Sequence, residues 1–380
     1  MRGFKDSRIY LEGRGIVRTS VAFENGRFVS FRSEADFSHL EDKYLIVPGF
    51  IDEHTHGGAG FDFMDAGEDG IRTIGKNFLQ DGVVAYLATT MTMKKEKIEN
   101  ALKRLGSYSS SEEEARLLGI HLEGPFISKA FCGAQNPADI LKPEGSLLEK
   151  WIRLSSGKIR LVTFAPEEAD ESFYETMKKH GIVKNAGHTA ASAQEMEQAI
   201  ERGLNGTTHT YNAMKGLHHR DIGTVGTALL NDALYSEIIA DRIHVSDEAI
   251  ALLLKCKPKE KVILITDSME AKYLSEGTYA LGGQEVYVDS CSARLKDGTL
   301  AGSILRLNQA LKNIREISGM PLTDIVDMAS LNPARNLGIQ DRKGSIALGK
   351  DADFVIIDED FNVYATYIGG KEAYRKERGK

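Results

Sequence analysis

Short apolar runs recur along the chain from Leu45, and more polar segments separate them. The eight runs span Leu45–Ile51, Val83–Ala88, Leu117–Leu122, Ile159–Phe164, Ile182–Lys184, Gly206–Thr210, Glu237–Ala240 and Lys261–Thr266. Several segments between them place apolar residues at three- and four-residue steps with charges between, as amphipathic helices do. The clearest are Lys94–Leu105, Asp170–His180 and Ser192–Arg202. The pattern predicts alternating strands and helices.

Eight strand and helix units with nearly continuous apolar strands predict an α/β fold, the (β/α)8 or TIM barrel, whose strands are covered on both faces. The runs at 182 and 206 are weak as strands, and the spacing supports them more than their composition does. Short β-like pieces also lie at both chain ends, for example Arg27–Phe31 and Val363–Ile368. We therefore expect a small β-sandwich domain from residues 1–46 and 340–380 beside a barrel over 47–339. Residues 278–300 are β-like as well, and they predict a hairpin beside the active site of the barrel.

Composition narrows the classes of partner. The net charge of −7 argues against the excess of basic residues that nucleic-acid-binding proteins usually carry. The N-terminus is charged, and no stretch approaches the roughly 18 apolar residues of a membrane span. Cys132, Cys256 and Cys291 are scattered without Cys-x-x-Cys spacing, which argues against a disulfide framework or a structural zinc site. These features predict a cytoplasmic protein that binds neither nucleic acid nor membrane.

Residues of the types that bind metals follow the apolar runs. In a barrel of this kind the active site lies at the carboxyl ends of the strands. The residues there are His54 and His56 after the first run, Glu123 after the third, His188 after the fifth, His209 in the sixth and Asp267 after the eighth. Each alone could be a solvated loop residue, a turn histidine or a helix cap. Their common position at strand ends favours a metal centre.

The sequence resembles the amidohydrolase superfamily and, within it, the N-acetylglucosamine-6-phosphate deacetylases, over nearly the whole chain. The motifs that carry the resemblance are Pro48-Gly-Phe-Ile-Asp-Glu-His-Thr-His-Gly-Gly58, His121-Leu-Glu-Gly-Pro-Phe126, Gly133-Ala-Gln-Asn136, Asn185-Ala-Gly-His-Thr189, Thr208-His-Thr-Tyr-Asn-Ala-Met214, Ile265-Thr-Asp267, Leu300-Ala-Gly-Ser303 and Ala329-Ser-Leu-Asn-Pro-Ala-Arg335. The His-x-His pair and the final aspartate are shared across the superfamily. The His-Leu-Glu-Gly-Pro and His-x-Tyr-Asn-Ala-Met motifs are more specific to the deacetylases.

The resemblance implies one or two divalent metal ions per subunit. Glu123, His188 and His209 would hold the first. His54, His56 and Asp267 would hold the second, with Glu123 as the bridge that a carbamylated lysine supplies in many members. Some deacetylases lack both histidines, so the pair predicts that this chain can hold two metals. Histidine and carboxylate ligands suit zinc, iron, manganese or cobalt.

The implied reaction is hydrolysis of an N-acetyl group on an amino-sugar 6-phosphate. Asp267 would act as the general base and then as the general acid for the leaving amine. The substrate-binding residues implied are Gln135, Asn212, Ala213, Arg220, His244, Leu300, Ala301 and Gly302. Arg220 would pair with the phosphate, and in family members it can reach a neighbouring subunit, so a homodimer is implied.

Two positions depart from the family pattern. Gln135 stands where some members have a histidine that polarises the substrate carbonyl. Arg242 stands where glycine is common, and it is expected either to narrow the sugar pocket or to supply a second phosphate contact.

Two other functions stay open. One is another amide or nucleobase hydrolase of the superfamily, similar to dihydroorotase or adenine deaminase. The other is a non-catalytic scaffold, which would be expected to have lost ligands, whereas here all six positions are occupied.

Overall fold

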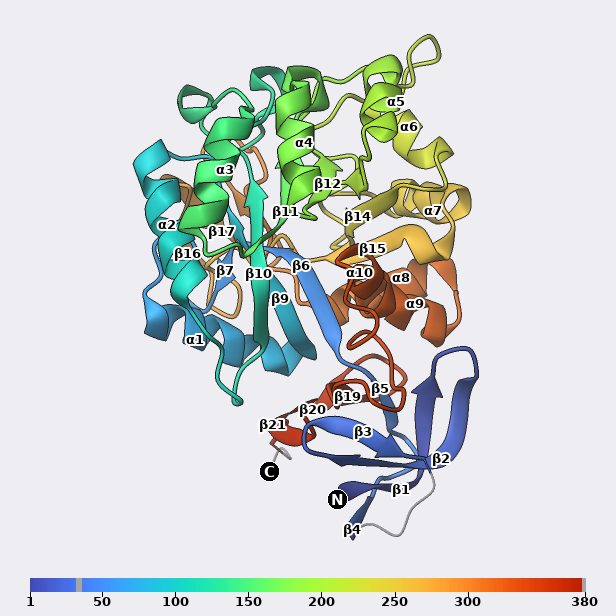
Figure 1. The fold of residues 1–380 in the computed structure, drawn as a ribbon. Coiled ribbons are helices and arrows are strands. Elements are labelled where there is room, and N and C mark those ends of the chain that lie inside the picture. Colours follow the sequence, from blue (N-terminus) through green and yellow to red (C-terminus); the bar gives the residue numbers. More distant parts are fainter. Residues whose placement is uncertain (32–35, 378–380) are drawn as a thin grey trace.

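The computed structural model describes residues 1–31 and 36–377. Residues 32–35 and 378–380 fall within the predicted terminal ranges and lie outside the described residues. A barrel of parallel strands and surrounding helices stands on a smaller sheet built from both ends of the chain (Figure 1). The barrel strands are β6 (Phe50–Thr55), β9 (Val83–Thr90), β10 (Arg116–Glu123), β11 (Ile159–Phe164), β12 (Val183–Ala186), β13 (Gly206–Thr207), β14 (Tyr235–Ile239) and β15 (Val262–Ile265).

The barrel strands are covered on both faces, which explains their continuous apolar runs. All eight residues of β9 are buried, for example. The weak runs at 182 and 206 form the two shorter strands β12 and β13. The predicted barrel is confirmed. Its helices are α1 (Glu68–Phe78), α2 (Lys95–Ser107), α3 (Gly145–Leu154), α4 (Glu171–Lys179), α5 (Ala193–Glu201), α6 (Gly223–Leu230), α7 (Asp247–Cys256), α8 (Leu307–Ser318), α9 (Leu322–Ala329) and α10 (Leu331–Asn336).

The three helices predicted from periodicity are α2, α4 and α5, and each end lies within one or two residues of the expected position. Local capping explains where two of them begin. The Asp170 side chain accepts a hydrogen bond from the backbone N–H of Phe173, and Ser192 forms a capping box with Glu195. Such caps satisfy backbone donors that the first helical turn leaves unpaired.

The prediction of one strand over Leu45–Ile51 is wrong. This run forms two strands in different sheets: β5 (Leu45–Pro48) belongs to the terminal sheet, and β6 belongs to the barrel. The break lies at Gly49, where a Cβ atom would come within 2.4 Å of a Val84 methyl group. Only glycine fits this close approach, so the chain passes from one sheet to the other through a single residue.

A side chain helps to close the barrel where its ladder ends. The ladder runs from β6 through β9 to β15, and no strand pairing joins β15 back to β6. The backbone N–H of Asp267 donates to the carbonyl of His54 at 2.9 Å. The buried Asp52 carboxylate accepts from the Thr266 N–H at 3.3 Å and from its hydroxyl at 2.6 Å. These bonds tie together the two strand ends that carry predicted ligands.

The terminal sheet combines strands from both chain ends. Its strands are β1 (Arg2–Leu11), β2 (Gly15–Glu24), β3 (Arg27–Ser30), β4 (Asp36–His39), β5, β19 (Phe354–Ile357), β20 (Val363–Ile368) and β21 (Lys371–Arg375). Phe23 on β2 and Phe354 on β19 are three positions apart in strand order, yet their ring centroids are 5.4 Å apart. The sheet therefore curls onto itself around an aromatic core. The division at residues 46 and 340 stays a prediction.

Three further strands lie beside the barrel mouth: β16 (Gly277–Leu281), β17 (Gln284–Val288) and β18 (Ala293–Arg294) form an antiparallel sheet. They confirm the predicted hairpin.

A two-stranded ribbon, β7 (Gly57–Gly58) and β8 (Phe61–Asp62), follows β6. Within the described residues, no helix combines the length and the apolar character needed to cross a membrane.

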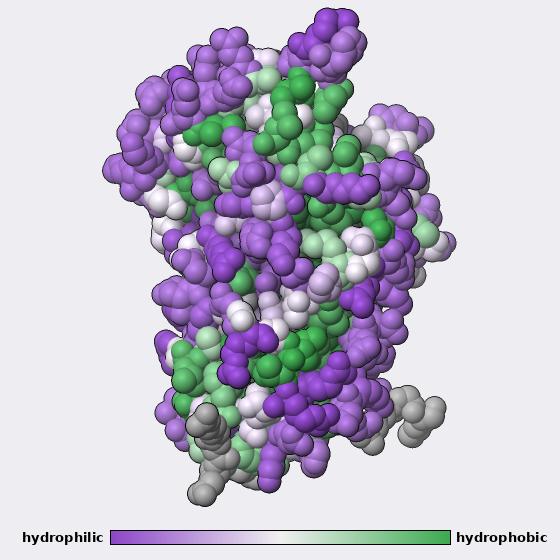
Figure 2. All heavy atoms as spheres, turned by 90° about the vertical axis from the view of Figure 1, so that its right-hand side faces the viewer, coloured by the Kyte–Doolittle hydropathy of each residue, from purple (hydrophilic) through white to green (hydrophobic). Residues whose placement is uncertain are grey.

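An apolar patch lies on the outside of the barrel. Figure 2 shows hydrophobic side chains gathered on the upper part of the face that includes α6 and α7. Among the exposed leucines are Leu230 at the end of α6, 73% exposed, Leu252 on α7, 47% exposed, and Leu217 in the loop before α6, 57% exposed. Large apolar side chains this exposed and close in the fold are typical of an interaction surface.

Candidate metal centre

The structure brings all six predicted ligands to one end of the barrel. His54 lies in β6 and His56 directly after it, and Glu123 ends β10. His188, His209 and Asp267 follow the carboxyl ends of β12, β13 and β15. All six are buried, with at most 9% of each residue exposed. Parallel strands in a barrel end at the same rim, so residues distant in sequence meet there.

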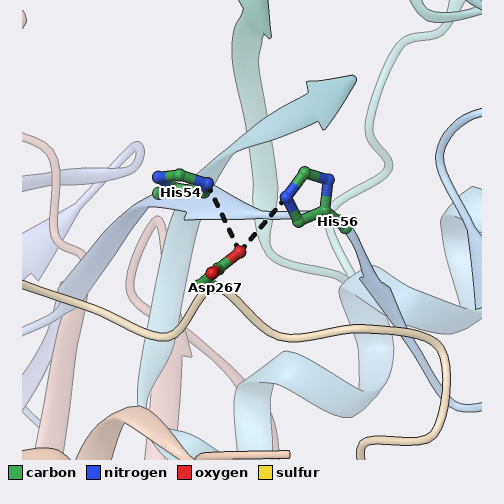
Figure 3. Close-up of side chains that lie close together, drawn as sticks. All are labelled: His54, His56 and Asp267. Carbon is green, nitrogen blue, oxygen red and sulfur yellow. Dashed lines mark ion pairs between the residues drawn. The ribbon is translucent and has the colours of Figure 1, made fainter. Parts of the chain in front are cut away.

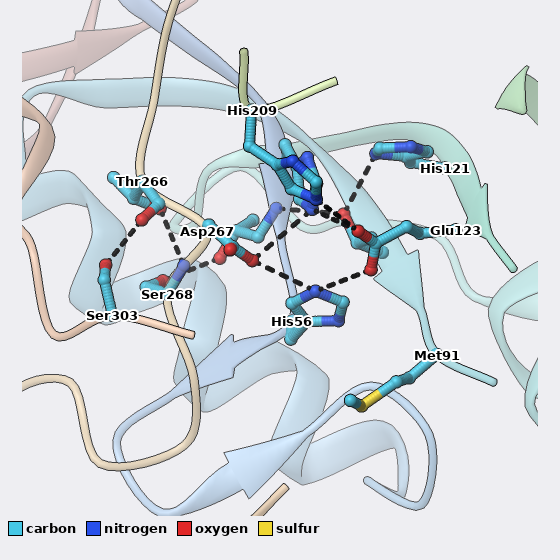
Figure 4. Close-up of polar contacts among 12 residues, drawn as sticks. His56, Met91, His121, Glu123, His209, Thr266, Asp267, Ser268 and Ser303 are labelled. Carbon is cyan, nitrogen blue, oxygen red and sulfur yellow. Dashed lines mark hydrogen bonds and ion pairs between the residues drawn. The ribbon is translucent and has the colours of Figure 1, made fainter. Parts of the chain in front are cut away.

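The first group is Glu123, His188 and His209. One Glu123 oxygen lies 3.1 Å from the Nε2 atom of His209 (Figure 4) and 3.1 Å from that of His188. These two nitrogens are 3.1 Å apart. Their possible ligand atoms lie within 4.8 Å of one another. A tight cluster of two imidazoles and one carboxylate matches a site for a single divalent ion.

The second group is His54, His56 and Asp267 (Figure 3). One Asp267 oxygen lies 3.4 Å from His54 Nε2 and 3.1 Å from His56 Nε2. Glu123 links the groups, since its other oxygen lies 3.2 Å from His56 Nε2. The arrangement has the form of two adjacent sites with a shared carboxylate.

Three of these residues have a strained backbone. The φ angles of His188, His209 and Asp267 are 49°, 32° and 49°, in the left-handed region that non-glycine residues rarely adopt. Such strain costs about 1–3 kcal/mol per residue and persists only where the surrounding structure enforces it. It is concentrated here at the turns that aim side chains into the site.

Two of the four histidine rings, those of His54 and His188, are oriented by oxygen acceptors on the side away from the carboxylates. The fully buried Glu237 on β14 lies 3.1 Å from His54 Nδ1, and the carbonyl of Phe131 accepts from His188 Nδ1 at 2.9 Å. Because each Nδ1 donates, the Nε2 of the neutral ring presents a lone pair to the carboxylates. Metal-binding histidines are commonly held this way.

The cluster is built to hold positive charge. Burial by itself lowers the pKa of His54, but Asp267, Glu123 and Glu237 raise it to about 9. Burial opposes ionisation of Glu123, yet the surrounding imidazoles hold the pKa of its carboxyl well below the usual range. In addition, His54 Nε2 is buried without a hydrogen-bond partner. A proton on His54 or a bound metal ion can supply this positive charge, and two imidazoles with one carboxylate in each group fit a divalent metal ion.

A cavity of about 210 Å³ opens beside these ligands. Its wall includes six of the predicted substrate-binding residues: Gln135, Asn212, Ala213, His244, Leu300 and Gly302. The side-chain oxygen of Gln135 accepts from the Thr92 N–H at 2.9 Å, which turns its NH₂ group toward His188 Nε2 at 3.2 Å. The Nδ1 of His244 is held by Asp241 at 2.6 Å. Amide and imidazole groups are thus fixed around a space beside the metal ligands.

Three predicted residues do not line this cavity. Arg220 lies on an exposed loop, where its guanidinium contacts His219 Nε2 at 2.7 Å. Ala301 is buried, and its N–H donates to the carbonyl of Ala293. The expectation that Arg242 narrows the pocket or supplies a phosphate contact is wrong for this chain. Its side chain pairs with Asp247 at 3.2 Å and with Glu316 at 2.9 Å.

The backbone of Arg242 explains why glycine suits this position. Its φ is 67°, a conformation that glycine adopts without steric cost. The sequence patterns did not predict the roles of Glu237 and Asp52. Glu237 contacts the Nδ1 of His54, and Asp52 accepts hydrogen bonds from Thr266 directly after β15. Glu237 interrupts the apolar run of β14, and a carboxylate inside a buried strand was the available signal.

Comparison with known proteins agrees with this geometry. Residues 45–373 match the model of the Amidohydrolase family. N-acetylglucosamine-6-phosphate deacetylase from Bacillus subtilis (strain 168) is 43% identical, over 97% of this chain and 96% of the relative. N-acetylgalactosamine-6-phosphate deacetylase from Escherichia coli O157:H7 is 36% identical, over 87% of this chain and 88% of the relative.

Solved structures show the same similarity. N-acetylglucosamine-6-phosphate deacetylase from Thermotoga maritima has a TM-score of 0.90 at 34% identity and covers 98% of this chain and 100% of its own. The D267A mutant of N-acetyl-D-glucosamine-6-phosphate deacetylase from Mycobacterium smegmatis, solved in complex with N-acetyl-D-glucosamine-6-phosphate, has a TM-score of 0.89 at 28% identity. The match covers 98% of each chain. The chain is therefore a member of the amidohydrolase family, in the N-acetylglucosamine-6-phosphate deacetylase branch.

Proposed function

We propose that this chain is a metal-dependent deacetylase that hydrolyses N-acetylglucosamine 6-phosphate to glucosamine 6-phosphate and acetate. The observation that carries the proposal is the pair of ligand groups sharing Glu123 beside a polar cavity. The names of the relatives point to the same substrate class. When bound, divalent metals in such a site activate water and polarise the amide carbonyl.

We propose that Asp267 moves the protons of this reaction. Burial raises the pKa of its carboxyl, but the charges of His54 and His56 outweigh burial and lower it overall. The carboxylate is therefore ionised at neutral pH and can accept a proton from the attacking water. Returning that proton to the departing nitrogen matters because an amide anion is a very poor leaving group.

The cavity supplies groups for the sugar. The NH₂ of Gln135 points at the metal ligands, where the substrate carbonyl would lie. Unlike an imidazolium, this amide donates a hydrogen bond without a positive charge, so carbonyl polarisation depends more on the metals. Asn212 and the Nε2 of His244 are available to the sugar hydroxyls or the phosphate.

The residue that binds the substrate's phosphate would come from a second subunit. Arg220 lies in the same exposed loop as Leu217, and the exposed leucines of α6 and α7 lie close by. Burying this patch would stabilise a homodimer. In that dimer Arg220 would reach the phosphate at the neighbouring cavity, where its planar guanidinium group can donate two hydrogen bonds.

We also propose a cytoplasmic location and zinc, iron, manganese or cobalt as the metal.

Acetate release tests the function directly. Metal-loaded enzyme should release acetate from N-acetylglucosamine 6-phosphate, and total metal analysis should find up to two ions per chain. Absence of release from fully metal-loaded protein would contradict the proposal and direct attention to cyclic amides and nucleobases. The 6-phosphates of N-acetylgalactosamine and N-acetylmannosamine complete the panel, since one relative is named for the galactosamine compound.

Arg220→Ala should raise KM for the phosphorylated sugar by about 10- to 100-fold, the loss expected for a hydrogen-bonded charge pair. Its KM for unphosphorylated N-acetylglucosamine should hardly change. Arg242→Ala is the matched control, because that side chain pairs with Asp247 and Glu316 away from the cavity. Equal effects of Arg220→Ala on both substrates would count against phosphate pairing.

A further inference from the structure

A second, larger cavity lies at the opposite end of the barrel from the metal ligands. Its volume is about 680 Å³, against about 210 Å³ for the cavity beside the ligands. It is lined by the first residues of β10 and β11, by the segment after α10 and by parts of the terminal sheet. The metal ligands follow the carboxyl ends of the strands, whereas Arg116 and Arg160 lie at amino ends. The two cavities are therefore separate.

The wall of this second cavity is strongly basic. It includes the five cations Arg27, Arg116, Arg160, Arg342 and Lys343, and the two carboxylates Asp351 and Asp353. Five positive and two negative charges leave an excess of three positive charges, although the whole chain has a net charge of −7. Like charges repel when they gather in one cavity, and a bound anion relieves that repulsion.

Not all of these cations are neutralised from within the protein. Lys343 contacts both aspartates, and Arg342 pairs with Asp351 at 3.1 Å. The guanidinium groups of Arg116 and Arg160 make no hydrogen bond or ion pair with another residue in the described part of the chain, although the backbones of both residues belong to the barrel strands. Glu112, whose carboxyl responds to the charge of Arg116, is ion-paired with Lys371. Two guanidinium groups thus remain available to a ligand.

The same cavity has an apolar side. Leu87, Leu118 and Leu337 line it and belong to a small hydrophobic cluster at this end of the barrel. Leu87 is fully buried, while Leu118 and Leu337 are partly buried. A volume of several hundred Å³, an apolar surface and a few convergent polar groups are the usual features of a small-molecule site.

We propose that this cavity binds a phosphorylated small molecule with an apolar or planar body, at a site distinct from the metal centre. Arg116 and Arg160 would hold the phosphate, because guanidinium forks match phosphate oxygens with paired hydrogen bonds. The leucines would contact the body of the ligand. The inference depends on the charges and shape of this cavity and not on the reaction proposed above.

The test uses the full-length, metal-loaded chain and 1-naphthyl phosphate as the probe, with binding measured by isothermal titration calorimetry. The double variant Arg116→Ala/Arg160→Ala should bind at least about tenfold more weakly, because it loses two charge-assisted contacts. The matched control is Arg14→Ala/Arg153→Ala, which removes the same charge from exposed positions outside the cavity. This control should bind like the unchanged chain.

Three outcomes would overturn the proposal. The first is no binding to the unchanged chain, and the second is equal affinity in both double variants, which would place the probe elsewhere. The third is equally tight binding of uncharged 1-naphthol, which would make the cavity apolar without preference for an anion. Thermal melting checks that the variants fold. If the double variant does not fold, Arg160→Gln at its exposed position serves instead and should weaken binding severalfold.

Discussion

Asp267→Asn should lower kcat by about 10²- to 10⁴-fold while the fold remains intact, because the amide cannot accept and return the proton. This corresponds to about 3–5 kcal/mol of lost transition-state stabilisation. The asparagine keeps the size of the side chain and one oxygen near His54 and His56, so most of the metal should stay bound. KM should change little. The measurements are steady-state kinetics and total metal analysis on the same preparation.

Asp232→Asn is the matched control, since this aspartate is exposed and precedes the amino end of β14, whereas the predicted ligands lie at the carboxyl ends of the barrel strands. It should turn over substrate like the unchanged enzyme. Near-normal turnover by Asp267→Asn at full metal content would refute its role in proton transfer. A fall in activity that follows metal loss in proportion would identify Asp267 as a ligand alone.

Glu123→Gln should remove the metal and reduce activity by about 10³-fold or more. Glu123 is the carboxylate common to both ligand groups, within 3.2 Å of His56, His188 and His209. The neutral amide cannot balance a divalent charge among buried imidazoles. Metal analysis after dialysis and acetate release with added metal would measure both effects.

Glu237→Gln provides a graded comparison. This carboxylate orients His54 from behind, and changes to such supporting residues typically cost 10- to 100-fold in metal affinity or activity. The order of effect should be Glu123→Gln first and Glu237→Gln second. Retention of metal and turnover by Glu123→Gln would contradict the shared-carboxylate arrangement.

Much of the fold could be predicted from sequence because the barrel strands are buried on both faces. Burial on both sides makes β9 or β15 a continuous apolar run, and the residue that ends the run lies on the rim. That reasoning led to Glu123 and Asp267 without any structure. The helices of strong periodicity, such as α2 and α4, were equally accessible because one face of each is polar.

Other features depend on contacts between distant segments. The break at Gly49 comes from the close approach of Val84, and nothing in the apolar run around it marks the change of sheet. The direction of Arg242 is set by Asp247 and by Glu316, which is 74 residues away. The role of Asp52 appears only where β15 returns to β6. Such relations follow from tertiary structure and leave no local pattern.

The single residue Gly49 joins the small sheet directly to the strand that carries a predicted metal ligand. A strand held at one end by β1 and β19 continues, with no flexible linker, into the strand that carries His54. The first and last segments of the chain therefore anchor the position of a metal ligand. A barrel excised at residue 49 would have the right sequence for its site but a loose first strand, so the terminal sheet is no detachable module.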